Sequence, residues 1–151
     1  MSTEFQDKGN MQHSLSCMLN KRGESILIVD DDLMILELCK SVLGLYGYEV
    51  VTSSSCEKAF SIIESDSTAI ALAILDLNLK DRREGMAIAT FLHSYNPTSK
   101  IIICSGSEPL IEAIDPTGEI VDICLNKPYE MYVLAHEVER LLSLRMKEMT
   151  S

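Results

Sequence analysis

Several features that would mark other classes of protein are missing from this chain of 151 residues. Basic residues are the minority, 13 against 23 acidic ones, so the chain lacks the basic face or stripe that binds nucleic acid. No apolar run reaches the roughly 18 residues of a membrane-spanning helix. The amino terminus also lacks the basic and then apolar order of a signal peptide. We therefore expect a cytoplasmic protein that binds neither nucleic acid nor membrane directly.

The spacings by which cysteine and histidine hold metal ions are absent as well. The five cysteines include no CxxC pair, and the three histidines have no ligand spacing to one another or to the acids. Four of the cysteines fall within apolar patterns, which is typical of small buried side chains. An odd number of cysteines without a signal peptide fits a reducing compartment. We predict neither a zinc site nor a disulfide framework.

The chain contains no internal repeat or low-complexity stretch, and its length fits one domain. Residues 1–23 are polar, with only a weak helical spacing of apolar side chains. They predict a flexible N-terminal tail, with a helix that docks on a partner as the alternative. Residues 24–148 predict a single domain, and no output domain is expected.

Short apolar runs alternate with amphipathic segments along this domain. The apolar runs predict strands at 25–29, 48–51, 71–75, 100–104 and 120–125. The segments between them predict helices at 32–46, at 85–94, at 108–114 and at 129–146, and a further helix that is capped by Ser54 and carries the apolar residues 59, 60, 62 and 63. Such alternation requires a parallel sheet with helices on both faces. We predict an α/β, doubly wound, flavodoxin-like (βα)5 fold, for which we take the known strand order 2-1-3-4-5.

Polar side chains follow four of the predicted strands at their carboxyl ends, where open α/β sheets bind ligands. Asp30 and Asp31 follow the first strand, Asp76 the third, Ser105 the fourth and Lys127 the fifth. Carboxylates on adjacent strands repel one another, and a divalent cation would relieve that repulsion. Oxygen ligands suit Mg²⁺, which also binds phosphate oxygens. The sequence therefore predicts a Mg²⁺ site at this edge of the sheet.

The same side chains are matched to phosphoryl transfer. A carboxylate beside Mg²⁺ can attack phosphorus and form an aspartyl phosphate, a role that we assign to Asp76. The transferred group spreads its charge over three oxygens. Mg²⁺ can hold one of them, the Ser105 hydroxyl can donate to the second, and the Lys127 ammonium to the third.

Four segments resemble the signature segments of response-regulator receiver domains, the phosphoacceptor domains of two-component signalling. They are residues 26–32 (ILIVDDD), 73–78 (AILDLN), 101–106 (IIICSG) and 126–129 (NKPY), in the family's order and spacing. The residues that match the family's functional positions are the phosphoacceptor Asp76, the metal-binding acids Asp30 and Asp31, Asn78 through its backbone carbonyl, the conformational hydroxyl Ser105 and the phosphate-binding Lys127. The resemblance also implies a cis peptide bond between Lys127 and Pro128, and it leaves Asp32 as a helix N-cap.

The chain departs from the family pattern in two places. The loop after Leu79, residues 80–84, is one residue longer than usual, and Glu84-Gly85 stands where the family often has Asp-Gly. Many receivers carry Phe or Tyr three residues before the lysine, and here that position holds Cys124. The loop bears on recognition by the kinase, and Cys124 puts the usual coupling between the hydroxyl and an aromatic ring in question.

The expected function is a phosphorylation-dependent switch in a phosphorelay. A histidine kinase or phosphotransfer protein would phosphorylate Asp76, and the protein would catalyse only its own phosphorylation and dephosphorylation. The signal would leave by protein–protein contact or onward phosphotransfer through the face of strand 4, helix 4, strand 5 and helix 5. The candidate residues of that face are Ile111, Ile114, Cys124, Tyr129 and Tyr132.

Two alternatives remain open. A receiver-like scaffold that is never phosphorylated would fit Cys124 and the altered loop, although it has no need for three crowded carboxylates. A phosphatase of the haloacid-dehalogenase type would use Asp30 and Asp32. That phosphatase is disfavoured because Met34 stands where its motif has Thr or Val, no cap domain is present, and Asp76 would be unexplained.

Overall fold

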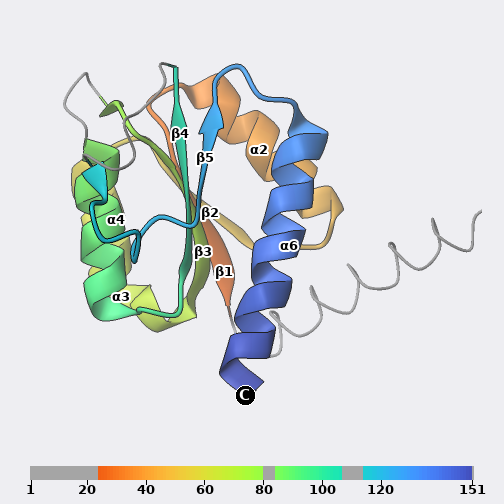
Figure 1. Cartoon of the computed structure of the whole chain (residues 1–151). Coiled ribbons are helices and arrows are strands. Elements are labelled where there is room, and N and C mark those ends of the chain that lie inside the picture. The colour runs from red at the N-terminus through yellow and green to blue at the C-terminus, as the bar shows by residue number, and fades with distance from the viewer. Residues whose placement is uncertain (1–23, 80–83, 107–113, 151) are drawn as a thin grey trace, which may run out of the picture.

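The structure is a computed structural model that describes residues 24–79, 84–106 and 114–150 (Figure 1). Its elements are β1 (Ser25–Val29), α2 (Leu33–Leu45), β2 (Val50–Ser53), α3 (Cys56–Asp66), the 3-10 helix η1 (Ser67–Ala69), β3 (Ile70–Asp76), α4 (Glu84–Tyr95), β4 (Lys100–Ser105), β5 (Ile123–Asn126) and α6 (Met131–Thr150). The five strands form one parallel sheet in the order β2-β1-β3-β4-β5, which confirms the predicted class and strand order.

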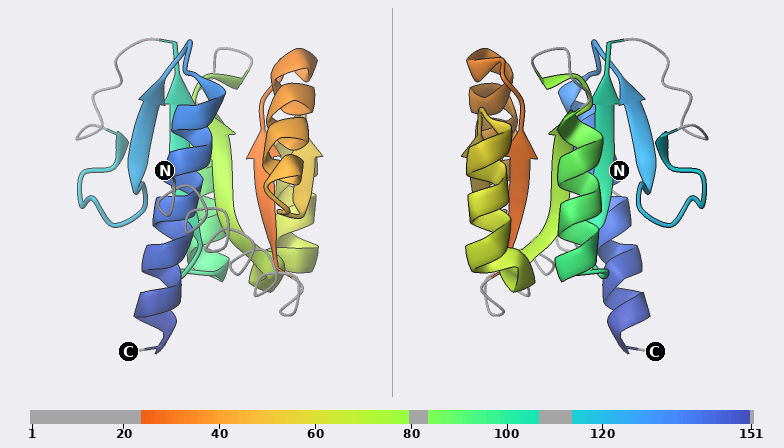
Figure 2. Two further views of the ribbon diagram at one scale, coloured as in Figure 1. Left: turned by 90° about the vertical axis from the view of Figure 1, so that its right-hand side faces the viewer. Right: turned by 90° about the vertical axis from the view of Figure 1, so that its left-hand side faces the viewer.

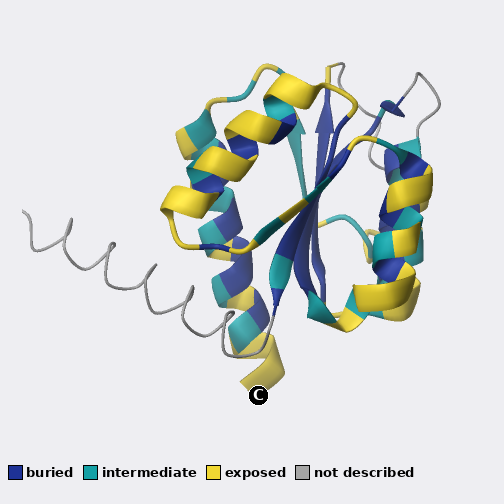
Figure 3. Cartoon of the chain, turned by 180° about the vertical axis from the view of Figure 1, so that it is seen from behind, coloured by how far each residue is buried: buried dark blue, intermediate teal, exposed yellow. Residues whose placement is uncertain are grey.

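Helices cover both faces of the sheet. Figure 2 shows α2 and α6 on one face and α3 and α4 on the other. Because side chains alternate along a strand, Ile26 and Ile28 pack toward α2 and α6, while Leu27 and Val29 pack toward α3 and α4. All seven residues of β3 are buried, as expected for a central strand covered on both faces. Figure 3 shows the buried central strands between helices whose outer faces are exposed.

The structure confirms the predicted ends of α2. The Asp32 side chain accepts a hydrogen bond from the backbone N–H of Met34 at 3.0 Å, which makes it the N-cap. After the helix, Gly47 adopts a positive φ of 89°, a conformation that glycine tolerates without steric cost. These two residues fix where α2 begins and ends relative to β1.

Four other predicted boundaries differ from the structure. β2 begins at Val50 instead of residue 48, because the buried Tyr48 still bonds back to the α2 carbonyl of Leu43. The N-cap of α3 is Ser55, whose hydroxyl accepts from Lys58, instead of Ser54.

β5 begins at Ile123 instead of residue 120. The Asp115 carboxylate accepts the backbone N–H groups of Ile120 and Val121, so these residues do not join the sheet ladder. The last helix, α6, runs on to Thr150, beyond the predicted end at residue 146. The helix predicted at 108–114 falls almost wholly outside the described residues.

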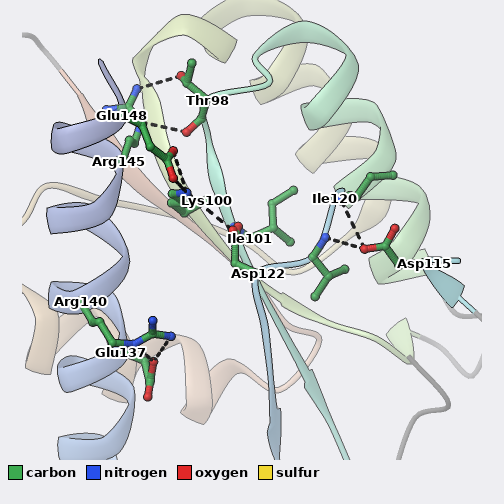
Figure 4. Close-up of polar contacts among 11 residues, drawn as sticks. Thr98, Lys100, Ile101, Asp115, Ile120, Asp122, Glu137, Arg140, Arg145 and Glu148 are labelled. Carbon is green, nitrogen blue, oxygen red and sulfur yellow. Dashed lines mark hydrogen bonds and ion pairs between the residues drawn. The ribbon is translucent and has the colours of Figure 1, made fainter. Parts of the chain in front are cut away.

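Charged side chains tie the end of α6 to the amino ends of the strands, opposite the predicted site (Figure 4). The Arg145 guanidinium lies 2.9 Å from Glu24, and both side chains are buried. Lys100 donates to Glu148 at 3.0 Å and lies 3.7 Å from Asp122. These contacts hold α6 against the amino ends of the strands, whereas the predicted site lies at their carboxyl ends. Within the described ranges, no helix combines the length and apolarity that crossing a bilayer requires.

Candidate phosphoacceptor site

Three carboxylates meet at the carboxyl edge of the sheet. β1 and β3 are parallel neighbours in which Val29 pairs with Leu75, so the residues that follow, Asp30 and Asp76, lie side by side. Asp31 completes the group, and carboxylate oxygens of the three residues lie within 4.8 Å of one another. Asp30 and Asp76 are buried, whereas Asp31 is exposed to solvent. The structure thus brings together the three acids that the sequence predicted.

Lys127 reaches into this group from the end of β5. Its ammonium donates to Asp30 at 2.7 Å and lies 3.5 Å from Asp76. Burial alone would lower the pKa of Lys127, but the hydrogen bond to Asp30 and the charges of both carboxylates raise it above its ordinary value. The lysine is therefore a firmly held cation, and the bond between Lys127 and Pro128 is cis, as the resemblance implied.

The environment of Asp76 disfavours its charged form. Burial raises the pKa of the Asp76 carboxyl above its ordinary value, and the charge of Asp30 adds to the increase. Lys127 and the backbone N–H of Asn78, which donates to Asp76 at 3.2 Å, act in the opposite direction. The groups around Asp76 therefore compensate only part of the cost of its negative charge.

The residues fit a hard divalent cation. Among the residues that the structure describes, three carboxylates lie next to one ammonium group, which leaves net negative charge in this group, and the available ligand atoms are oxygens. Mg²⁺ favours such oxygen ligands and keeps several waters, which the exposed side of Asp31 leaves room for. Asp30, Asp31 and Asp76 would hold the ion. The backbone carbonyl of Asn78 stays a prediction as a fourth ligand.

Ser105 ends β4, the strand beside β3, and its side chain is buried. In that pairing Asp76 lies opposite Cys104, so Ser105 stands one position further toward the site edge. Its carbonyl accepts the backbone N–H of Lys127 at 2.7 Å, which links the two residues directly. The residues at the carboxyl ends of β1, β3, β4 and β5 therefore lie together at one edge of the sheet, as predicted.

A cluster beneath the site was not predicted. The Tyr129 hydroxyl lies 3.7 Å from the Cys39 sulfur, and the thiol of Cys104 borders the same hydroxyl. Burial raises the pKa of Cys104 to about 12, and burial together with the two thiols raises the pKa of Tyr129 as well. Cys39 and Tyr129 are 90 positions apart, so only the tertiary fold reveals this contact.

The residues predicted for an output face flank the edge strand β5 and pack on both sides of the sheet. Tyr129 packs on the core beneath α2 and α6, whereas Ile114 and Cys124 pack on the side of α3 and α4. Tyr132 is 67% exposed, and Ile111 lies outside the described residues. Tyr129 is therefore better placed to support the loop of Lys127 than to contact a partner.

Comparison with known proteins agrees with this geometry. A family model for the response regulator receiver domain matches residues 26–139. The transcriptional regulatory protein DcuR of Escherichia coli (strain CFT073) is 30% identical over 127 residues, 83% of this chain and 52% of that protein. The chain thus spans about half the length of the curated relatives it matches.

Solved structures show the same fold. A CheY-like response regulator receiver domain from Methanospirillum hungatei has a TM-score of 0.75 and 29% identity, over 83% of this chain and 98% of that one. A response regulator receiver protein from Sinorhizobium medicae has a TM-score of 0.71 and 28% sequence identity, over 81% of this chain and 96% of that one. The fold is a doubly wound α/β domain with a cluster of carboxylates at the carboxyl edge of its sheet, and the family match makes the assignment specific. The chain belongs to the family of response-regulator receiver domains.

Proposed function

We propose that this protein is a signalling switch that accepts a phosphoryl group on Asp76. The observation that carries the proposal is the convergence of three carboxylates with Lys127 2.7 Å from Asp30 and 3.5 Å from Asp76. A domain needs no such concentration of buried charge for stability, because buried ion pairs are weak stabilisers. It does need it to bind a cation and a phosphoryl group together.

The reaction follows from what each residue offers. A carboxylate oxygen of Asp76 attacks the phosphorus of a phosphohistidine on the donor protein. The P–N bond breaks, and its electron pair stays on the imidazole nitrogen, which takes up a proton. Bound Mg²⁺ would supply positive charge for the phosphoryl oxygens and for the crowded carboxylates.

Lys127 supplies the second positive charge. In the present structure its ammonium is bonded to Asp30, and a cation that takes Asp30 as ligand leaves this ammonium available for a phosphoryl oxygen. The hydroxyl of Ser105, carried by the strand beside Asp76, donates to another. In this proposal the protein catalyses only its own phosphorylation and dephosphorylation.

The donor protein has to cover the edge around Asp76. The first turn of α2 borders this edge and exposes large apolar side chains, Leu33 at 65% and Met34 at 82%, with Leu38 one turn on at 50%. Exposed apolar side chains grouped on one helix are typical of an interaction surface. A histidine kinase or phosphotransfer protein is therefore the proposed partner for this end of α2.

The output is proposed to be protein–protein contact or onward phosphotransfer, through the side formed by β4, β5 and α6. Cys124 on β5 is half-buried and brings no aromatic ring to this side. Ring movement at this position is thus not the means of transmission. A shift of β4 through Ser105 is the proposed first step instead.

The test is phosphorylation by a small donor. The protein is incubated with acetyl phosphate, with and without Mg²⁺, and its intact mass is measured beside Asp76→Asn and Asp30→Asn. We expect one added phosphoryl group that requires Mg²⁺ and is lost in Asp76→Asn. No modification under any condition would favour the unphosphorylated scaffold. Modification that survives in Asp76→Asn and is lost in Asp30→Asn would favour the phosphatase.

A further inference from the structure

Gly85, the second residue of α4, touches the backbone of the phosphoacceptor. A Cβ atom placed on Gly85 would overlap the carbonyl oxygen of Asp76 and would lie 2.7 Å from the Cα of Leu77 and 2.8 Å from the carbonyl carbon of Asp76. The backbone N–H of Gly85 also donates to the Leu77 carbonyl at 3.2 Å. Only a residue without a side chain allows α4 to approach β3 this closely.

Neither α4 nor the backbone at Asp76 and Leu77 can move away from this contact without disturbing other packing or hydrogen bonds. On one side, Ile88, Ala89 and Leu92 fix α4 in the core and are fully buried. On the other side, Leu77 donates its backbone N–H to the carbonyl of Cys104 in β4 at 2.8 Å. The backbone at Asp76 and Leu77 is therefore held between α4 and β4. Since protein cores are close-packed, a small movement on one side has to appear on the other.

We infer that Gly85 is a positioning residue that sets where the Asp76 carboxylate and the neighbouring Asn78 backbone stand. The inference rests on the proposed function, because it concerns the same site. Asn78 already donates to Asp76 at 3.2 Å, so a displaced Asp76 backbone moves both residues together. The contact explains why the residue at this position is glycine although its φ lies outside the positive range.

The test compares Gly85→Ala with Gly44→Ala in the full chain. Gly44 also lies in a helix, but a Cβ there meets nothing within 4 Å, so this variant controls for the added methyl group and for helix propensity. Circular dichroism first identifies conditions under which both variants are folded. Under these conditions we measure the dissociation constant for Mg²⁺ and the rate of phosphorylation by acetyl phosphate. We expect both to worsen about tenfold or more in Gly85→Ala and to stay within about twofold of wild type in Gly44→Ala.

Folded Gly85→Ala protein with wild-type Mg²⁺ affinity and rate would overturn the inference, because a purely structural glycine changes stability alone. The Mg²⁺ measurement also separates the two proposals. If the wild-type protein binds Mg²⁺ but accepts no phosphoryl group, the proposed function is refuted, and the Mg²⁺ affinity of Gly85→Ala still tests the role of Gly85. A wild-type protein that binds no Mg²⁺ overturns both.

A measurement on the wild type covers the case in which Gly85→Ala does not fold. Of the seven glycines, only Gly85 follows a glutamate, so ¹³C-carbonyl glutamate with ¹⁵N-glycine labelling isolates its amide signal. Titration with Mg²⁺ and then beryllofluoride is expected to shift this signal, while the Gly44 amide stays in place. A Gly85 amide that does not move while other site signals do would contradict the inference.

Discussion

At the scale of single residues, the site places ionised groups where they cost stability. Asp76 is 7% exposed and lies beside Asp30, so its charge is poorly solvated. The pKa of its carboxyl is raised, which means that the folded protein holds the proton more tightly than the unfolded chain does. The contribution of Asp76 to stability is then fully present below its unfolded-state pKa and is lost as the pH rises through its folded-state pKa.

The first prediction follows from this sign. In the absence of Mg²⁺, Asp76→Asn should increase the free energy of unfolding at pH 7 by on the order of 1 kcal/mol, since a neutral amide avoids the cost of the buried charge. The gain should shrink as the pH falls toward the ordinary aspartate value of 3.8. Urea unfolding measures it, with the exposed Asp31→Asn as the control that gains less. A variant less stable than wild type at pH 7 would contradict this account of the site.

The second prediction concerns Cys104, whose pKa burial raises from 9.0 to about 12. Between these values the unfolded chain loses the thiol proton and the folded chain keeps it, so the free energy of unfolding should fall as the pH rises above 9, by up to roughly 1.4 kcal/mol per pH unit. Urea unfolding at pH 8, 9 and 10 should show this decline, and Cys104→Ala should make it shallower, although the other buried thiols, whose pKa values are also raised, keep part of it. An equal slope in both proteins would show that another group is responsible.

At the scale of elements, α6 depends on one buried ion pair. Arg145 is 2% exposed and Glu24 6%, and the guanidinium also donates to the carbonyl of Thr98 at 3.1 Å. The same helix carries an exposed pair, Arg140 with Glu137, at 2.7 Å. The two pairs have similar lengths, but the Arg145 pair is buried, reaches outside the helix and is joined by bonds to Thr98, whereas the Arg140 pair is local and more exposed.

The third prediction uses that comparison. Arg145→Ala should lower the free energy of unfolding by about 3 kcal/mol, because it leaves the Glu24 carboxylate buried without its cation. Arg140→Ala should cost less than about 1 kcal/mol, since exposed pairs contribute little. Chemical denaturation gives both values. The double variant Glu24→Gln/Arg145→Met should recover part of the loss, and equal losses for the two arginine variants would refute the role of burial.

The element scale also shows where sequence patterns stop being informative. Predicted strand 1 was confirmed residue for residue, because a buried parallel strand reads as a continuous apolar run. The start of β5 was missed, because it depends on Asp115, whose carboxylate takes the N–H groups of Ile120 and Val121. The start of β2 was missed because Tyr48 is apolar and buried without being part of the sheet. Both misses arise from contacts that the local pattern does not contain.

At the scale of the whole molecule, the topology explains why the site could be predicted so fully. Once five parallel strands are inferred, their carboxyl ends have to meet at one edge, and the residues after four of them can be read from the sequence. The packing behind the site could not be read in this way. The contact of Tyr129 with Cys39 joins α2 to the segment between β5 and α6, 90 positions apart in the sequence. The fit of Gly85 against Asp76 depends on how deeply α4 packs.

The central claim is that Asp76, and no other carboxylate of the cluster, carries the phosphoryl group. The most direct measurement phosphorylates the protein with acetyl phosphate and Mg²⁺, reduces the acyl phosphate with borohydride, and locates the resulting homoserine by peptide mass spectrometry. We expect homoserine at position 76 alone, and none when Mg²⁺ is withheld. Homoserine at position 30 or 31, or its absence from every position, would contradict it.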